Sequence, residues 1–151
     1  MTYTYRIAKP FILLLPFLFA ACSSTSVGAQ ASQLKPCPSS PNCVSTEAAQ
    51  DKQQISPFRI KGSVVVAWEE LQRQVENLPR TKIVAVSDEY LHAECRSALF
   101  RFVDDLEFQL RPEQGIIAIR SAARTGYSDF GVNRKRVETL RATLISQGVV
   151  E

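Results

Sequence analysis

The first regular pattern of hydrophobic and polar positions along the chain is helical. Apolar side chains recur every three or four residues, at Val64, Trp68, Leu71, Val75 and Leu78. This spacing places them on one face of an amphipathic helix. Ser63 precedes the pattern and is a suitable N-cap, and Pro79 prevents the helix from continuing. We therefore expect the first helix between Ser63 and Pro79.

Strand-like segments follow this helix. Four of them are rich in β-branched residues or alternate between apolar and polar side chains: residues 81–86, 90–97, 100–110 and 115–121. Because the connections between them are short, they predict an antiparallel meander. A second helical pattern, with Val137, Leu140, Leu144 and Ile145 facing inward, begins near Ser128 or Gly131 and ends at Ser146. The expected fold is α+β, a two-layer domain in which an antiparallel meander of about four strands packs with two helices.

One carboxylate interrupts the alternation of residues 100–110. Asp104 falls on the apolar face with Phe102 and Leu106, whereas Asp105 and Glu107 fall on the other face. An isolated charge is costly to bury, so we expect Asp104 to be buried and paired with an arginine. The candidate partners are Arg120, Arg124, Arg134 and Arg136.

Most of the nearby cations lie in residues 120–136, RSAARTGYSDFGVNRKR. Backbone N–H groups at the start of a helix attract anions, and arginine makes two-pronged contacts to carboxylate or phosphate. The segment is therefore a candidate site for a small anionic ligand, a lipid headgroup or a protein partner. Its candidate binding residues are Arg120, Arg124, Ser128, Asp129, Asn133, Arg134 and Arg136. In the structural alternative, Asp129 caps the last helix and the arginines pair with Asp104, Asp105 and Glu107.

The residues give little support to catalysis. His92 is the single histidine, and strand alternation points it away from Cys95, which disfavours a Cys-His pair. We expect His92 to lie beside Glu94 or to be half-exposed. The alternative is a hydrolase-type enzyme that uses Asp104, Asp105 and His92 in a pocket between sheet and helices. No cofactor and no metal site are predicted.

Two cysteines, Cys37 and Cys43, lie close together in CPSSPNC. The first residues of the chain, described next, indicate export to an oxidising compartment, where disulfides persist. We therefore predict a Cys37–Cys43 disulfide. The alternatives are reduced thiols and a zinc site, although the spacing is not Cys-x-x-Cys. Cys95 fits the alternation as a small buried apolar residue.

The start of the chain has the features of an export signal. Residues 1–21 carry two basic side chains, a short apolar run and small residues before Cys22. LFAAC resembles a bacterial lipoprotein processing site, and this resemblance implies cleavage before Cys22 and a lipidated Cys22, with palmitate as an expected fatty acid, as the mature N-terminus. The alternative is cleavage after Ala29. Residues 22–36 are expected to form a flexible tether and residues 37–148 a single domain.

The charge balance bears on location and partners. The chain has a formal net charge of +3, but Arg6 and Lys9 are two of its 18 basic residues, so 16 remain against 15 acidic residues after processing. A nearly neutral mature protein argues against nucleic acid as a partner. The resemblance to bacterial lipoproteins implies the periplasmic face of the outer membrane as the expected location, because Ser23, rather than Asp, follows the cysteine. A soluble periplasmic protein is the alternative.

Four segments resemble a known family: PNCVS at 41–45, YLHAE at 90–94, FVDDLEF at 102–108 and RSAARTGYSDFGVNRKRVE at 120–138. They are similar to the domain-of-unknown-function family 1499, which is found in bacteria and plastids. The resemblance covers about residues 37–144, with small departures at Cys95 and Ala123. It implies a small exported or membrane-associated domain and no particular chemistry. We therefore expect a membrane-anchored periplasmic accessory lipoprotein with a binding or structural role.

Overall fold

The computed structural model describes residues 1–2 and 34–151. The predicted signal peptide, the lipidation site Cys22, the alternative cleavage site and residues 22–33 of the tether lie outside the described part. In chain order the elements are β1 (Cys43–Ser45), the 3₁₀-helix η1 (Asp51–Gln53), β2 (Phe58–Arg59), α1 (Val64–Glu76), β3 (Thr81–Val86), β4 (Tyr90–Arg96), β5 (Val103–Arg111), the 3₁₀-helix η2 (Pro112–Gln114), β6 (Ile116–Ala123) and α2 (Val132–Ser146).

The strands form one antiparallel sheet in the order β1-β6-β5-β4-β3, with β2 also paired to β6. The α+β class and the meander, β3 to β6, are as the sequence predicted. The predicted number of strands was too low, because the described sheet has six. Strands β1 and β2 are only three and two residues long, which is too short for an alternating pattern to reveal them.

Strand β5 begins later than the alternation suggested. Phe100 and Phe102 precede it and are 69% and 54% exposed, so they do not share the buried face of Leu106. The Ser97 amide donates to the Phe102 carbonyl, and the Phe102 amide donates to Ser97 Oγ, both at 2.9 Å. These two bonds close a loop from Ser97 to Phe102, so the rings of Phe100 and Phe102 lie outside the sheet. Asp104 keeps the predicted parity and is buried.

Both helices lie where the periodicity placed them. Ser63 caps α1, since its Oγ accepts a hydrogen bond from the Val66 amide. Helix α2 begins after Gly131, whose φ of +78° lies in the left-handed region that glycine tolerates. The prediction that Ile145 faces inward was wrong, because it is 46% exposed while Leu144 is buried.

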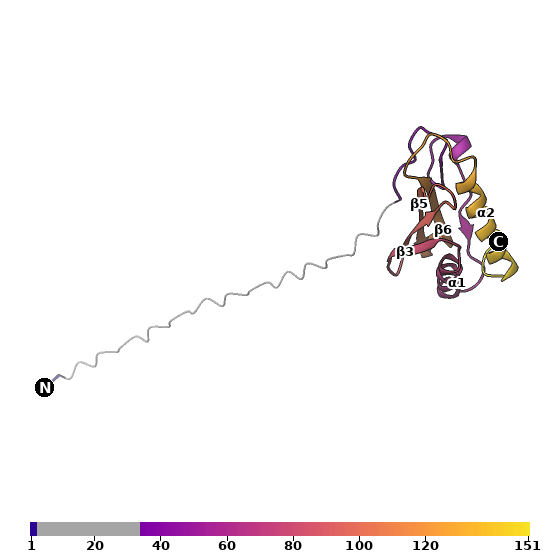
Figure 1. Cartoon of the computed structure of the whole chain (residues 1–151). Coiled ribbons are helices and arrows are strands. Elements are labelled where there is room, and N and C mark those ends of the chain that lie inside the picture. Colours follow the sequence, from indigo (N-terminus) through magenta and orange to yellow (C-terminus); the bar gives the residue numbers. More distant parts are fainter. Residues whose placement is uncertain (3–33) are drawn as a thin grey trace.

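The core lies between the helices and one face of the sheet. That face supplies Leu91, Leu106, Phe108 and Ile119, which cluster with Trp68, Leu71, Val137 and Leu144 of the helices. In Figure 1, α2 lies to the right of the sheet, and the described part of the domain starts on the left. The core therefore uses only the face of the sheet that packs against the helices, and the opposite face is not part of it.

The segment before β1 is attached to the domain at several points. Cys37 and Cys43 form a disulfide, as predicted, and Cys95 is a free, buried thiol. Gln53 Nε2 donates to the carbonyls of Pro38 and Ser40, at 2.8 Å each. Packing extends beyond the predicted limits of 37–148, because Leu34 is 4% exposed and Val150 bridges to Ile60.

Neither helix in the described ranges combines the length and the apolar character that a bilayer crossing requires.

Candidate functional site

The sheet face opposite the helices carries a row of ionisable side chains across its three central strands. Alternation places Tyr90, His92 and Glu94 of β4 on this face. The register sets His92 opposite Glu107 and Glu94 opposite Asp105 on β5. On the next strand, Arg120 lies opposite Glu107. We call this surface the open face.

The first cluster on the open face is centred on Glu107. Arg120 Nη1 donates to Glu107 Oε2 at 2.6 Å, and Tyr90 Oη donates to Glu107 Oε1 at 2.7 Å. Glu107 and Arg120 are only 4% and 8% exposed. Because each carboxylate oxygen accepts a bond from a neighbouring strand, this buried charge is compensated.

The second cluster is centred on Asp105. His92 Nε2 lies 2.7 Å from Asp105 Oδ1, a diagonal contact between neighbouring strands. Arg124 adds a two-pronged contact, from Nη2 to Oδ1 at 2.7 Å and from Nε to Oδ2 at 3.0 Å. Its Nη2 also donates to Glu94 Oε1 at 2.7 Å. Arg124 therefore bridges the carboxylates of β4 and β5.

These contacts alter the acid–base properties of the second cluster. Partial burial pushes the pKa of Asp105 upward, but hydrogen bonds from Arg124 and His92 outweigh that effect and leave the pKa below its usual value of 3.8. The pKa of Arg124 is raised by its hydrogen bonds to Asp105 and then to Glu94. Asp105 is therefore an ionised anchor for its neighbours at neutral pH, and a weak general base.

A cavity of about 660 Å³ lies over the two clusters. Its floor includes His92, Asp105, Glu107, Arg120 and Arg124, and its wall is the segment 35–38. The Cys37–Cys43 disulfide fixes this wall next to β1. The volume is within the range of sites for small ligands. We call this cavity the open-face pocket.

Arg120 has hydrogen-bonding capacity that the described residues do not use. Its Nε is buried and has no partner in residues 1–2 and 34–151. A buried donor without a partner costs free energy, so an acceptor close to it is favoured. The carboxylates of the pocket are already bonded, whereas Lys35 and Arg124 are exposed at its edge. The hydrogen-bond donors and positive charges of the pocket therefore favour a ligand that is an acceptor or an anion.

Asp104 belongs to a separate cluster on the helix side of the sheet. Arg136 Nη2 donates to Asp104 Oδ2 at 2.7 Å, and Arg136 Nη1 donates to Asn133 Oδ1 at 2.8 Å. Ser121 also donates its hydroxyl to Asn133, which is fully buried. Each carboxylate that the sequence singled out for ion pairing thus has an arginine partner, but Asp104 faces away from the open-face pocket.

The other candidate binding residues have structural contacts. Asp129 Oδ2 accepts from the Asn133 amide at 2.8 Å, which satisfies an N–H group at the start of α2. Ser128 Oγ accepts from the Phe130 amide. Arg134 Nη2 donates to the carbonyls of Lys52 and Gln54, at 2.9 Å each. These residues therefore shape the turn before α2 and attach that helix to the η1 segment.

Of the seven candidate binding residues, the structure brings Arg120 and Arg124 to the open-face pocket, and Ser128 and Asp129 to a separate groove. The catalytic alternative needs a similar correction. Asp105 and His92 share the open-face pocket, whereas Asp104 points to the other side of the sheet, because adjacent strand residues face opposite ways. The catalytic alternative is therefore reduced to His92 and Asp105, without Asp104.

Sequence reasoning did not identify Tyr90 and Lys35 as site residues. The alternation of β4 placed Tyr90 and His92 on one face, but the register to β5 that joins them to Glu107 and Asp105 depends on the folded sheet. Lys35 lies in the segment predicted as a tether, where no periodic pattern indicates contact with the domain.

Comparison with known proteins gives one match. A family model described as "Protein of unknown function (DUF1499)" matches residues 33–144. No curated protein and no solved structure matches the chain.

Proposed function

The chain belongs to the DUF1499 family of proteins of unknown function, and we propose that it is a binding module whose open-face pocket takes a small ligand with a carboxylate or phosphate group. The observation that carries this proposal is the buried Arg120, which lines the pocket and whose Nε has no hydrogen-bond partner in the described residues. Arg124 and Lys35 add positive charge at the pocket edge.

The balance of charges favours an anion over a cation. Three cationic side chains line the open-face pocket, against two carboxylates that already accept hydrogen bonds. A ligand cation would have to compete with Arg120 and Arg124 for those carboxylates. A ligand anion instead adds acceptors to a guanidinium pair, which matches the planar geometry that arginine prefers.

We further propose that the module works from a lipid anchor at Cys22, on the periplasmic face of the outer membrane. The apolar run that ends in LFAAC supports this location. Mass spectrometry of the mature N-terminal peptide tests it: an acylated Cys22 is expected. An unmodified N-terminus at Gln30 would instead indicate a soluble periplasmic protein.

Thermal unfolding with and without ligand tests the binding proposal. A ligand that binds only the folded state raises the melting temperature as its concentration exceeds Kd. We expect glycerol 3-phosphate or succinate to stabilise the protein, and neutral glycerol at the same concentration to stabilise it less. Stabilisation by glycerol alone, or by none of the three at millimolar concentration, would contradict the proposal.

Two arginine variants locate the effect. Arg124→Gln removes an exposed cation from the pocket and should abolish most of the ligand-dependent shift. Arg134→Gln is the matched control, because Arg134 binds the backbone of Lys52 and Gln54 away from the pocket. If the ligand raises the melting temperature of both variants equally, the ligand binds outside the open-face pocket.

A second candidate function is supported by the 2.7 Å contact between His92 and Asp105 inside the same pocket. A carboxylate that orients a histidine is one component of general base catalysis. Turnover of a carboxylate or phosphate ester that is lost in His92→Gln but kept in Arg134→Gln would favour an enzyme over a binding module.

A further inference from the structure

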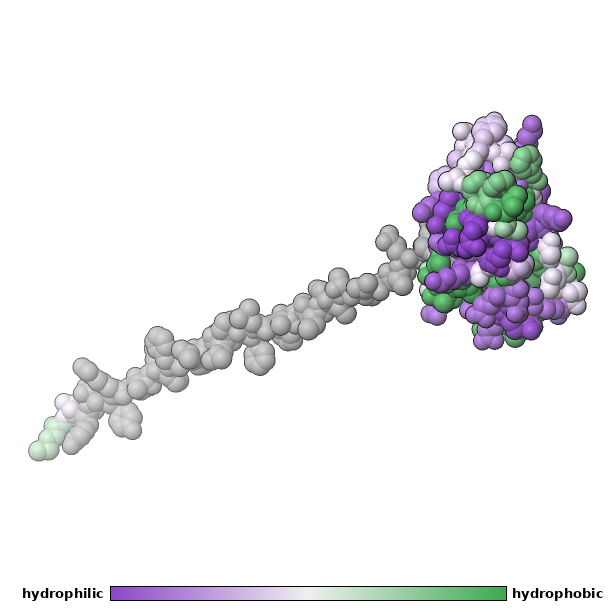
Figure 2. Space-filling view, viewed as in Figure 1, coloured by the Kyte–Doolittle hydropathy of each residue, from purple (hydrophilic) through white to green (hydrophobic). Residues whose placement is uncertain are grey.

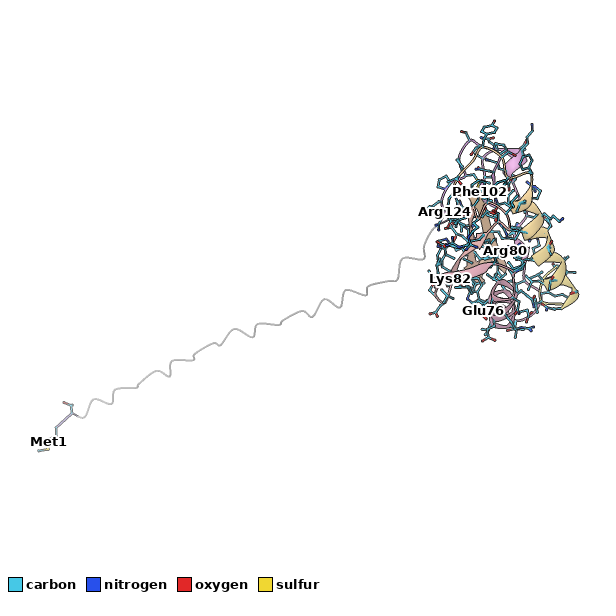
Figure 3. The ribbon with its side chains drawn as sticks, viewed as in Figure 1. Met1, Glu76, Arg80, Lys82, Phe102 and Arg124 are labelled. Carbon is cyan, nitrogen blue, oxygen red and sulfur yellow. A yellow bond between two sulfur atoms is a disulfide. The ribbon has the colours of Figure 1, made fainter. Side chains whose placement is uncertain are left out.

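Exposed apolar side chains gather at one end of the domain, in the loop between β4 and β5, the turn before α2 and the first residue of α2. We define the tip patch as Leu99, Phe100, Phe102, Phe130 and Val132, which are 79%, 69%, 54%, 96% and 49% exposed. In Figure 2 a hydrophobic area lies where Figure 3 labels Phe102. Exposed apolar areas of this kind mark interaction surfaces.

All five tip-patch residues line an apolar groove of about 440 Å³. The carboxylates that also line it are already bonded, Asp104 to Arg136 and Asp129 to the backbone at the start of α2. Phe100 and Phe102 stack on each other, with ring centroids 5.6 Å apart, rather than on the core. The groove therefore presents a largely hydrocarbon surface to the surroundings.

Both tip loops contain a residue with a strained backbone conformation. Arg101 and Phe130 have φ of 54° and 53°, in the left-handed region that residues with a side chain rarely adopt. Phe130 nevertheless remains 96% exposed, so burial of its ring does not offset this strain. Strained backbone positions cluster at functional sites, and two of them lie in the exposed tip loops.

Cations lie beside the tip patch. Arg101 lies between the two phenylalanines in the chain and is exposed. Arg80 and Arg96 line a neighbouring groove that shares Ala98 and Val132 with the tip. Figure 3 labels Arg80 and Arg124 close below Phe102, where Figure 2 shows a hydrophilic area. Apolar rings bordered by arginines match a bilayer interface, which is apolar beneath a layer of phosphates.

The start of the domain places this surface within reach of a membrane. Leu34 is the twelfth residue after Cys22, so a lipid at Cys22 would hold Leu34 within about 40 Å of the bilayer even with the intervening chain fully extended. Ala123 lines both the open-face pocket, whose wall is the segment 35–38, and the tip groove. The attachment side of the domain and the tip patch are therefore neighbours.

We propose that the tip patch docks on an anionic lipid surface. The rings of Phe100, Phe102 and Phe130 enter the interfacial layer, and Arg80, Arg96 and Arg101 contact the lipid phosphates. This docking is independent of the ligand in the open-face pocket and adds a second contact to the proposed anchor at Cys22.

Vesicle sedimentation tests the docking. The protein is the processed chain from residue 22 with Cys22→Ser, which removes the acylation site and keeps every described core residue, from Leu34 to Val150. We expect it to bind vesicles of phosphatidylcholine with phosphatidylglycerol more strongly than vesicles of phosphatidylcholine alone. Phe100→Ser/Phe130→Ser should weaken binding by about tenfold or more, since two aromatic rings leave the interface.

Val65→Ser/Val86→Ser is the matched control. Both valines are exposed, line a different groove, and lie outside the tip patch. The control variant should bind vesicles as the unmodified protein does. Circular dichroism of both variants should show unchanged folding, because all four side chains are more than half exposed.

A fluorescent probe tests the orientation. Trp68, the single tryptophan, is 6% exposed, so a tryptophan introduced by Phe130→Trp reports on the tip. Its emission should shift to shorter wavelength with anionic vesicles. Unchanged emission, or equal vesicle binding by the Phe100→Ser/Phe130→Ser variant, would overturn the proposal. A concentration-dependent dimer that the same variant abolishes would also overturn it, by assigning the patch to a second copy of the chain.

Discussion

Asp105 is the residue at which acid–base chemistry and stability are most directly linked. Its folded-state pKa lies below the usual value of 3.8, so its contribution to stability is fully present above that value. The contribution is lost as the pH falls through the folded-state pKa, when the carboxylate takes up a proton and its bonds to Arg124 and His92 weaken.

Asp105→Asn should therefore change the pH dependence of stability in acid. The melting temperature of the unmodified protein should exceed that of Asp105→Asn at about pH 6, and the difference should shrink as the pH falls below 3.8 and the carboxylate takes up its proton. Thermal melts over this range measure it. A difference that stays constant with pH would show that the charge of Asp105 does not stabilise the fold.

Asp104→Ala should destabilise the domain strongly. The side chains of Asp104 and Arg136 are 10% and 15% exposed. Removing one partner of a buried pair leaves an uncompensated charge, which costs about 3–5 kcal/mol. Arg73→Gln removes an exposed ion pair on α1 and should cost no more than about 0.5 kcal/mol. Urea unfolding of the two variants compares them, and similar losses would exclude a structural role for the Asp104–Arg136 pair.

At the scale of elements, the disulfide ties the segment 35–38 to β1 and so forms one wall of the open-face pocket. Cys37→Ser/Cys43→Ser should lower the free energy of unfolding by about 2–3 kcal/mol, because a short loop is no longer closed in the unfolded chain. Chemical denaturation measures this loss. The same variant should bind small anions more weakly, because a wall of the pocket is no longer fixed, and should bind vesicles as the unmodified protein does. A variant as stable as the unmodified protein would contradict this account of the disulfide.

Periodicity identified the elements that are long enough to show it. The meander β3 to β6 and both helices follow from apolar spacing alone, and the parity of Asp104 predicted its burial. Two short strands and the exposure of Phe100 and Phe102 did not follow from it. A pairing of two or three residues, and a loop closed by Ser97 and Phe102, depend on contacts that an alternating pattern does not encode.

The sequence predicted which types of residue form the candidate site, but not how these residues are arranged. Residues 120–136 and 102–108 supplied the arginines and carboxylates that pair in the structure. Their division between the two faces of the sheet depends on strand register and on the position of α2. For this reason Arg120 and Arg124 reach the open-face pocket, whereas Arg134 and Arg136 hold structural contacts.

At the scale of the whole molecule, the open-face pocket and the tip patch lie on neighbouring parts of one small domain. The segment 35–38 lines the pocket, and Ala123 lines both the pocket and the tip groove. With the proposed docking of the tip patch, this arrangement would place the ligand site close to a lipid surface. A small anion bound there would be held close to the bilayer.

The central claim, that the open-face pocket binds small anions, is tested most directly by the nuclear magnetic resonance signals of His92. This residue is the single histidine of the chain and lines the pocket, so its ring signals need no further assignment. We predict that glycerol 3-phosphate shifts them in a saturable way in the unmodified protein and in Arg134→Gln, and much less in Arg124→Gln. Signals that stay unmoved at millimolar ligand, or that move equally in Arg124→Gln, would contradict the account.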